Sequence, residues 1–266
     1  MQIYYLNLAR RPDRRLFMDE QFARLGLAAT RIEAVAAADI PAETLESYAG
    51  GRLGFWLTPP ELGCTLSHLK AYEAMIALGH DYAAVFEDDA VLSESLPRFL
   101  AAFEADPPVL DLLRIESLEY GLRLGPERTE LAGFAICRPY SLAVGSAGYI
   151  VSLRAAEILL AHPATRNVQI DVMLFDPFGR TGRDIDRRQL VPALCVQAHH
   201  HEETTARVRK SDVRHNRADI EARLFWRRLP HVVSVILYRD VFIAARKAWL
   251  HYTRGVTKQF VRFQPH

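Results

Sequence analysis

The sequence predicts an α/β fold with a mainly parallel central sheet, and three observations support this prediction. Short apolar runs rich in β-forming residues alternate with segments of helical periodicity, which is typical of layered α/β proteins. The 266 residues, 50% of them hydrophobic, suffice for a large core and exclude a disordered or disulfide-stapled chain. Three acids directly follow one apolar run, where open α/β sheets generally bind ligands.

The first elements follow from the N-terminal residues. Residues 3–8 (IYYLNL) predict a buried strand, and apolar residues at helical spacing predict a helix over 13–25. Gly26 is a suitable stop for that helix, and residues 30–35 predict a second strand. No long apolar run follows a basic stretch here, so we expect no secretory signal.

The next helix has a clear start. Thr58 can cap it, Pro59 suits its first position, and Glu61 stands at the capping-box position three residues after the cap. Apolar residues keep helical spacing as far as Gly79, where we expect the helix to end. Residues 82–86 (YAAVF) then predict a buried strand.

Three further elements are predicted beyond the middle of the chain. Residues 147–151 (AGYIV) predict another apolar strand, and Ser152 can cap the helix that follows as far as residue 160. Residues 190–196 predict a short strand. The sequence contains no internal repeat or low-complexity segment.

The acids Glu87, Asp88 and Asp89 end the strand predicted at 82–86. Adjacent carboxylates at the end of an apolar strand repel one another, and burial raises their pKa values further. A divalent cation resolves both costs, since hard oxygen ligands suit Mg²⁺ and Mn²⁺. The alternative is a solvated acidic turn that only begins the next loop.

An arginine cluster follows the first predicted strand; it comprises Arg10, Arg11, Arg14 and Arg15. Planar guanidinium groups beside a strand end suit the recognition of phosphate or carboxylate. The alternative is a solvated helix start, although basic residues there oppose the helix dipole.

Several single residues are candidates with two interpretations each. Ser67 and His68 lie within the capped helix, where a lone histidine is either structural or part of a site. Asp171 stands between apolar residues and either caps a helix or serves as a general base at a cleft. Of the three consecutive histidines that begin at His199, one can act as a metal ligand, because neighbouring side chains do not converge on one ion.

Together these motifs resemble glycosyltransferase family 25, the lipopolysaccharide and lipooligosaccharide biosynthesis glycosyltransferases. The matching stretches, in the family's order, are NLARRPDRR at 7–15, ELGCTLSHLKAYE at 61–73, AVFEDDAVL at 84–92 and SAGYIVSLRAAEILL at 146–160. The resemblance covers roughly residues 1–200. It implies a GT-A-like, nucleotide-sugar-binding α/β fold and transfer of a sugar, usually galactose from UDP-galactose, with inversion at the anomeric carbon.

The resemblance also implies roles for individual residues. The EDD sequence takes the place of the family's DxD-type motif, with Asp89 as a ligand to Mn²⁺ or Mg²⁺. We expect the acceptor to be a lipopolysaccharide or other surface glycan. The other roles expected on this resemblance are Asp171 as catalytic base and Asn7, Arg10, Ser67, His68, Glu87 and Asp88 as nucleotide-sugar contacts. From the histidine cluster, and not from the resemblance, we expect His199 as a second metal ligand.

The charge is divided unevenly along the chain. Residues 206–266 carry 14 Lys and Arg against 4 Asp and Glu, whereas residues 1–205 carry 19 against 28. We therefore predict a transferase domain over 1–205 and a basic helical C-terminal extension over 206–266. Basic segments with Trp and Tyr suit an anionic membrane surface, and packing of the extension on the body is the alternative.

Other features bound the location and the partners. No window reaches the length of a spanning helix, and the three widely spaced cysteines indicate buried thiols in a reducing compartment. We thus expect a cytoplasmic protein, peripheral on the inner face of the cytoplasmic membrane if the extension binds lipid. No motif supports a nucleic-acid partner. Two rival hypotheses are a phosphohydrolase of the haloacid-dehalogenase type, suggested by VFEDDAVL, and a non-catalytic membrane-surface adaptor.

Overall fold

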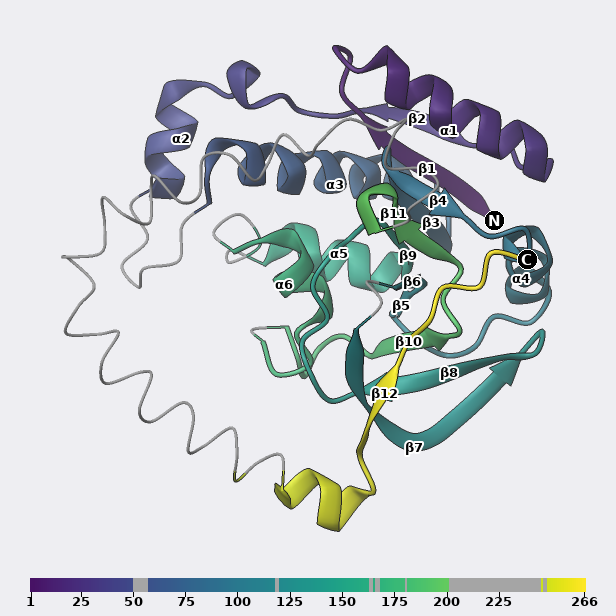
Figure 1. The fold of residues 1–266 in the computed structure, drawn as a ribbon. Helices are drawn as coiled ribbons and strands as arrows, with labels where there is room; N and C mark the ends of the chain where they lie inside the picture. Colours follow the sequence, from purple (N-terminus) through teal and green to yellow (C-terminus); the bar gives the residue numbers. More distant parts are fainter. Residues whose placement is uncertain are drawn as a thin grey trace.

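The structure, a computed structural model, describes residues 1–49, 57–117, 120–162, 165, 168–179, 181–200, 245 and 248–266. A large twisted sheet forms the centre of the described part, with helices on both of its faces (Figure 1). The α/β class predicted from the sequence is confirmed. Most of the basic segment that begins at residue 206 lies outside the described residues.

Nine strands of the described part form the central sheet in the order β12-β7-β8-β10-β5-β9-β3-β1-β2. In chain order they are β1 (Gln2–Asn7), β2 (Thr30–Glu33), β3 (Tyr82–Glu87), β5 (Leu112–Arg114), β7 (Gly121–Leu131), β8 (Phe134–Pro139), β9 (Gly148–Ser152), β10 (Arg187–Val191) and β12 (Thr257–Phe260). The strands predicted at 3–8, 30–35, 82–86 and 147–151 correspond to β1, β2, β3 and β9.

The sheet is mixed, so the prediction of a mainly parallel sheet is wrong. β1 pairs in parallel with β2 and β3, and β10 with β5, but β9 is antiparallel to both β3 and β5. The β7–β8 pair is a hairpin whose turn residues Ala132 and Gly133 have φ values of 52° and 82°. A two-residue turn with positive φ at both positions joins only antiparallel strands.

The helices form two layers. α1 (Pro12–Leu25) and α4 (Leu96–Ala105) pack on one face of the sheet, and α3 (Pro59–Ala77), α5 (Leu153–Ala161) and α6 (Ile170–Phe175) pack on the other. The central strands are apolar on both faces because both are covered. In β1, for example, Tyr4 and Leu6 join one core cluster while Ile3 and Tyr5 join the other. A shorter helix, α2 (Ala42–Ala49), follows a 3₁₀ turn at Ala37–Asp39.

The predicted helix signals are confirmed. The Thr58 hydroxyl accepts a hydrogen bond from the Glu61 amide, and the Glu61 carboxylate accepts one from the Thr58 amide, which completes the capping box of α3. The Ser152 hydroxyl accepts a hydrogen bond from the amide of Ala155 at the start of α5. Gly26 ends α1 with a φ of 65°, a left-handed conformation that favours glycine.

A second, three-stranded sheet lies beside the end of β3. It consists of β4 (Ala90–Leu92), β11 (Cys195–Gln197) and β6 (Glu116–Ser117), with β11 in the middle. The apolar run predicted as one strand at 190–196 is therefore divided between β10 and β11. A 3₁₀ turn, η3 (Ala198–His200), follows β11 directly.

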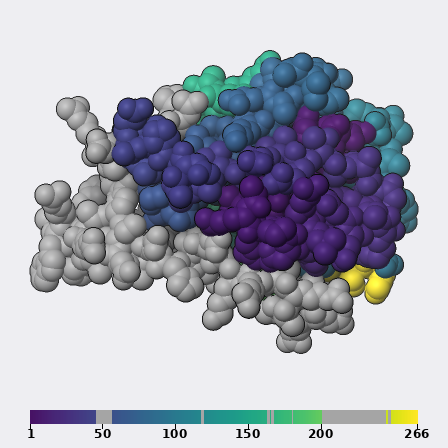
Figure 2. Space-filling model, turned by 90° about the horizontal axis from the view of Figure 1, so that it is seen from above, coloured from purple at the N-terminus to yellow at the C-terminus, as the bar shows by residue number. Residues whose placement is uncertain are grey.

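The C-terminal end of the chain joins the central sheet. β12 pairs antiparallel with β7, and Phe263 bridges to Ala193 (Figure 1). The space-filling view shows the N-terminal residues, in purple, over much of one face, with yellow C-terminal residues at its edge (Figure 2). At least residues 257–266 of the predicted extension are thus packed on the body, whereas the boundary at 205/206 stays a prediction. Among the described residues, none of the helices has the length and apolar character to cross a membrane.

Candidate active site

The three acids lie at the carboxyl end of β3, in the turn that leads into β4. Glu87 is the last residue of β3, and Asp88 and Asp89 connect it to Ala90 at the start of β4. Asp88 and Asp89 are buried, at 7% and 9% exposed, and the Glu87 side chain is partly buried, at 24% exposed. The solvated-turn alternative is therefore wrong, because this acidic turn is buried.

Asp88 is held by two residues from the N-terminal segment. Its carboxylate accepts hydrogen bonds from the Asn7 amide at 2.8 Å and from the Arg14 guanidinium at 2.7 Å. Burial raises the pKa of Asp88, and Arg14 and Asn7 oppose that shift. Asn7 is itself buried, and its side-chain oxygen accepts a hydrogen bond from Arg31. Asn7 therefore positions Asp88, while its role as a nucleotide contact stays a prediction.

Asp89 carries the most perturbed acidity of the three. Burial raises the pKa of Asp89 to about 7, and the neighbouring charge of Glu87 adds to the shift. One of its oxygens lies 3.5 Å from Arg14, whereas the other, Oδ1, is buried without a hydrogen-bond partner among the described residues. A buried carboxylate oxygen that lacks a donor suits a cation.

Glu87 faces the opposite direction, toward α3 and the segment before β9. It accepts a hydrogen bond from the Ser146 hydroxyl at 2.5 Å, and the Nε2 atom of His68 lies 3.5 Å away. Burial alone would raise the pKa of Glu87, but His68 and Ser146 together bring it below the ordinary value. Glu87 is therefore the acid of the turn that is most readily ionised.

His68 is fully buried; its Nδ1 hydrogen-bonds in the core, while its Nε2 faces Glu87 at 3.5 Å without a hydrogen bond among the described residues. Its Nδ1 lies 2.7 Å from the Tyr149 hydroxyl, which in turn lies 2.6 Å from the Tyr72 hydroxyl. Cys64, one turn earlier on α3, approaches the same place, so that its Sγ, a ring nitrogen of His68 and a Glu87 oxygen lie within 4.8 Å of one another. His68 thus orients Glu87 from within the core, and direct contact of His68 with a nucleotide sugar stays a prediction.

The segment before β9 connects three carboxylates through consecutive residues. The Gly145 amide donates to Asp171 at 3.1 Å, the Ser146 hydroxyl donates to Glu87, and the Ala147 amide donates to Glu116 at 3.0 Å. Gly145 has a φ of 88°, and a Cβ atom there would stand 2.7 Å from a Glu116 oxygen, so the close approach requires glycine. One tripeptide therefore fixes acids from three separate elements.

Asp171 is brought to the site by this tripeptide. It stands in the first turn of α6, and its second oxygen accepts a hydrogen bond from the Val172 amide at 2.8 Å. Burial raises the pKa of Asp171, although the two backbone N–H groups oppose the shift. The capping interpretation is wrong, because Gln169 is the N-cap residue of α6 and Asp171 lies inside its first turn. The general-base interpretation stays a prediction.

Glu116 is a site residue that the sequence does not reveal. It is fully buried in β6, accepts hydrogen bonds from Ala147 and Gln197, and lies 3.3 Å from the Arg114 guanidinium. Burial raises the pKa of Glu116 to about 8, against the opposing charge of Arg114. A single acid between Ile115 and Ser117 forms no pattern, and only the packing around residue 145 identifies it.

A cavity of about 140 Å³ opens beside the acidic turn. Glu87, Asp88, Cys64 and Ser67 contribute to its wall, together with Arg10 from the segment after β1. The arginine cluster is divided, because Arg14 pairs with the acids whereas Arg10 is exposed at the cavity. Of the four arginines, Arg10 therefore stands where an anionic ligand would enter.

Ser67 forms part of the wall by joining two elements. Its hydroxyl donates to the Gly63 carbonyl at 2.6 Å and accepts from the Val35 amide at 2.8 Å, which ties the segment after β2 to α3. A Cβ atom at Gly63 would stand only 2.6 Å from the Val35 carbonyl oxygen, so the two segments meet at backbone contact. These bonds give Ser67 a structural role at the cavity, and a contact with the nucleotide sugar stays a prediction.

Replacement of Ser67 by alanine is expected to lower the free energy of unfolding by about 1–3 kcal/mol, because the Val35 amide loses its acceptor. Urea unfolding measures this loss. Ser95→Ala is the matched control, because no side-chain cap is made by Ser95 at the start of α4, and a change within about 0.5 kcal/mol is expected there. Equal stabilities of Ser67→Ala and Ser95→Ala would contradict this role.

His199 lies in η3, next to the acidic turn along the backbone. The Ala198 amide donates to the carbonyl of Asp89 at 2.8 Å, and the rings of His199 and His200 are 3.9 Å apart at their centroids. The structure thus brings the backbone before His199 to Asp89, while ligation of a metal by its ring stays a prediction.

The residues present fit a divalent cation. A cation would relieve three features of the turn. They are the Asp89 oxygen that has no donor within the described part of the chain, the adjacent carboxylates of Glu87 and Asp88, and the raised pKa of Asp89. Oxygen ligands of this kind suit Mn²⁺ and Mg²⁺. Glu87 and Asp88 line the cavity, and Asp89 as a ligand to such an ion stays a prediction.

The chain is similar to known sugar-transferring proteins. Residues 1–174 match the model of glycosyltransferase family 25 (LPS biosynthesis protein). The lacto-N-neotetraose biosynthesis glycosyltransferase LgtB of Neisseria meningitidis is 30% identical over 76% of this chain and 77% of its own. The lipooligosaccharide biosynthesis protein lic2B of Haemophilus influenzae is 26% identical over 73% of this chain and 75% of its own.

Among solved structures, a glycosyltransferase involved in glycosylation of the major capsid of PBCV-1 aligns with a TM-score of 0.40 at 10% identity; the alignment covers 77% of this chain and 99% of that one. The family match extends from β1 through most of α6 and includes the acidic turn, the tripeptide at 145–147 and Asp171. The chain belongs to glycosyltransferase family 25 and is a glycosyltransferase.

Proposed function

We propose that this enzyme transfers galactose from UDP-galactose to a lipopolysaccharide or other surface-glycan acceptor, with inversion and with dependence on Mn²⁺ or Mg²⁺. The observation that supports this most strongly is the buried acidic turn at the end of β3. One Asp89 oxygen there lacks a donor among the described residues, and Glu87 and Asp88 line a cavity that Arg10 borders. The family assignment favours this enzyme over the phosphohydrolase and the non-catalytic adaptor.

Recognition of the donor follows from the charges around the cavity. Without a cation the acids would repel a nucleotide diphosphate, and Arg10 carries the positive charge among the described residues of the wall. A bound Mn²⁺ or Mg²⁺ supplies Lewis-acid stabilisation of the departing diphosphate. Asp89 would hold this ion together with Glu87 or Asp88. Asn7 and Arg14 keep Asp88 in position. Arg10 contacts the phosphates.

Asp171 is proposed as the catalytic base. Inversion requires that the acceptor hydroxyl lose its proton as its oxygen bonds to the anomeric carbon, while the bond to the departing diphosphate breaks on the opposite face. The Asp171 carboxylate would receive that proton, and burial, which raises its pKa, makes it a stronger base than an exposed aspartate. The Gly145 amide holds this carboxylate beside the residues that contact Glu87.

A transfer assay tests the proposed reaction. The purified enzyme is incubated with UDP-galactose, UDP-glucose or UDP-N-acetylglucosamine, de-galactosylated lipooligosaccharide and either Mn²⁺ or EDTA. We expect transfer from UDP-galactose in Mn²⁺, loss of transfer in EDTA, and a β-linked product by NMR. Transfer that persists in EDTA would contradict the metal dependence, and an α-linked product would contradict inversion.

We further propose that the basic residues between 206 and 254 hold the enzyme on the anionic inner face of the cytoplasmic membrane, where a lipid-linked acceptor is presented. This region carries 12 of the 33 Lys and Arg residues. Deletion from residue 231 onward is a poor test, since it would also remove β12 from the sheet.

Substitution within the basic region, with the C-terminal end intact, tests the membrane proposal. Replacing Arg207, Arg209, Lys210 and Arg214 by glutamine is expected to weaken co-sedimentation with phosphatidylglycerol vesicles at least tenfold, because each charge contributes about 1 kcal/mol near such a surface. Replacement of Arg123, Arg128, Arg138 and Arg154 by glutamine, which removes the same charge from the body, is the control. Equal losses in both variants would contradict a role specific to this region.

A further inference from the structure

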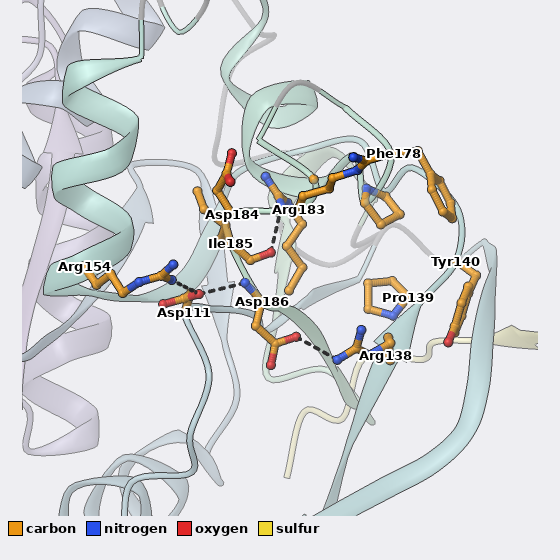
Figure 3. Close-up of a pocket in the computed structure, with 13 residues that line it drawn as sticks. Asp111, Arg138, Pro139, Tyr140, Arg154, Phe178, Arg183, Asp184, Ile185 and Asp186 are labelled. Atoms are coloured by element: carbon orange, nitrogen blue, oxygen red, sulfur yellow. Dashed lines mark hydrogen bonds and ion pairs between the residues drawn. The ribbon is translucent and has the colours of Figure 1, made fainter.

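A second, larger cavity lies away from the acidic turn (Figure 3). Its volume of about 380 Å³ is within the range of small-molecule binding pockets. Its walls come from the end of β8, the segment between α6 and β10, and the start of α5. Polar and aromatic side chains both face it.

This cavity and the candidate active site lie at opposite ends of the strands of the central sheet. Ala83 in β3 is level with Val151 in β9, which is level with Leu112 in β5. Asp111, which lines the cavity, directly precedes Leu112, whereas Glu87 lies four residues beyond Ala83. At about 3.3 Å per residue the two places are roughly 17 Å apart along the strands. A ligand in one therefore leaves the other open.

Two ion pairs fix the polar side of the cavity. Arg154 donates to Asp111 at 2.6 Å, and Arg138 donates to Asp186 at 3.3 Å (Figure 3). The side chains of Arg154 and Arg138 are 60% and 44% exposed, so each guanidinium keeps N–H groups that can serve a ligand. The carboxylates hold these donors in place, which lowers the entropy cost of binding.

The segment that closes the cavity is braced by a buried arginine. The Arg187 guanidinium donates to the carbonyls of Met173 at 2.9 Å, Thr181 at 2.9 Å and Ile185 at 3.0 Å. Arg187 is only 4% exposed, so these bonds lie inside the protein. The cavity is therefore a built feature, with a wall anchored to the core.

Both signs of charge face the cavity. Exposed Arg183 and Asp184 lie at its rim, in addition to the two ion pairs. Asp184 and Asp186 would repel a phosphate, and the three exposed arginines would repel a cation. A neutral ligand that both donates and accepts hydrogen bonds matches this arrangement, as the hydroxyl groups of a sugar do.

The other side of the cavity is apolar and aromatic. Tyr140 and Phe178 lie across from Asp111 and Arg154, with Pro139 beside them (Figure 3). Phe178 is 47% exposed, so part of its side chain is accessible to solvent. Aromatic rings offer a flat surface for the C–H face of a pyranose, while the opposite wall serves its hydroxyl groups.

We propose that this cavity binds a neutral glycan and is distinct from the site where the sugar is transferred. The choice of a glycan rests in part on the proposed function, since a surface-glycan acceptor would supply this ligand. Glycan bound in this cavity, at the other end of the strands, would keep the enzyme attached to a glycan-covered surface. The acidic turn would stay accessible to a donor.

Binding is measured by saturation-transfer NMR and by titration calorimetry on the full chain, with lactose, chitotetraose and lacto-N-neotetraose as probes and inorganic phosphate as the anionic comparison. We expect at least one of the glycans to bind, with excess UDP causing no displacement. Phe178→Ala is expected to weaken binding about tenfold, because a stacking surface is lost. Phe260→Ala removes another exposed phenylalanine, from β12, and is expected to bind as the wild type does.

Several results would overturn the proposal. They are the absence of binding by all three glycans, binding of phosphate that competes with them, equal affinities of Phe178→Ala and wild type, or displacement by UDP. If Phe178→Ala melts at a lower temperature than the wild type, Arg183→Ala provides a second variant. It is expected to bind the glycan several-fold more weakly than the wild type. Glu87→Gln is expected to keep glycan binding while it loses transfer, so a failure of the proposed reaction is distinguishable from a failure of this site.

Discussion

Replacement of Asp89 by asparagine is expected to lower kcat for sugar transfer about a thousandfold and to stabilise the metal-free protein. The loss of activity follows because the proposed ligand of the cation is gone, and such an ion contributes several kcal/mol of transition-state stabilisation. The gain in stability follows because Asp89 is buried beside Glu87 and Asp88, and one of its oxygens has no donor among the residues that the structure describes. Enzyme kinetics and urea unfolding in EDTA measure the two effects.

The stabilisation by Asp89→Asn is expected to depend on pH. The pKa of Asp89 in the folded chain is about 7, above its ordinary value of 3.8, so the folded protein retains a proton that the unfolded chain releases between these values. The free energy of unfolding of the wild type therefore falls as pH rises from about 4 to about 7, and the asparagine variant escapes this loss. The free energy of unfolding of Asp89→Asn is expected to exceed that of the wild type by on the order of a few kcal/mol above pH 7. The difference is expected to vanish near pH 4.

A matched control is available on the same strand. Asp81 immediately precedes β3 and is exposed, so Asp81→Asn removes an equal charge from the opposite end. That variant is expected to keep both kcat and stability. If Asp89→Asn retained more than a tenth of the wild-type kcat, or if it were less stable than the wild type at pH 8, the role given to Asp89 would be contradicted.

Replacement of Asp171 by asparagine is expected to lower kcat about 100- to 10,000-fold with little change in the KM for the donor. An asparagine can still accept the Gly145 hydrogen bond, but it cannot take a proton from the acceptor hydroxyl. Because burial raises the pKa of Asp171 above 3.8, wild-type activity should fall as pH falls through this raised pKa, and the residual activity of the variant should lose that limb.

The control for Asp171→Asn is Asp106→Asn, in an exposed residue at the end of α4. Kinetics as a function of donor concentration, acceptor concentration and pH separate the effects. A raised donor KM with unchanged kcat would assign Asp171 to donor binding. An unchanged pH profile would exclude it as the base.

The features that local sequence predicts well are those that depend on local bonds. The capping box at Thr58 and Glu61 and the cap at Ser152 use partners three residues away, so the residues alone specify them. Continuous apolar runs likewise located β1, β3 and β9. The identity of the acidic turn as a site followed from its position after an apolar strand, and its burial in the structure agrees with that interpretation.

Other features depend on contacts between distant residues. The direction of β9 relative to β3 is set by the path of the chain from residue 88 to residue 147, which no periodicity records. Glu116 becomes a site residue only because Gly145 and Ala147 pack against it, and β12 pairs with β7 more than a hundred residues earlier. The assignment of Arg14 to Asp88, and of Arg10 to the cavity, also required the fold, because four neighbouring arginines are equivalent in the sequence.

The melting temperature in the presence of UDP-galactose tests most directly whether the acidic turn is a metal-dependent donor site. A ligand that binds the folded state raises the apparent stability in proportion to its occupancy. With UDP-galactose and Mn²⁺ together we expect a clear rise for the wild type and for Asp81→Asn, no rise with UDP-galactose in EDTA, and no rise for Asp89→Asn. An equal rise in EDTA, or an equal rise in Asp89→Asn, would contradict this role of the acidic turn.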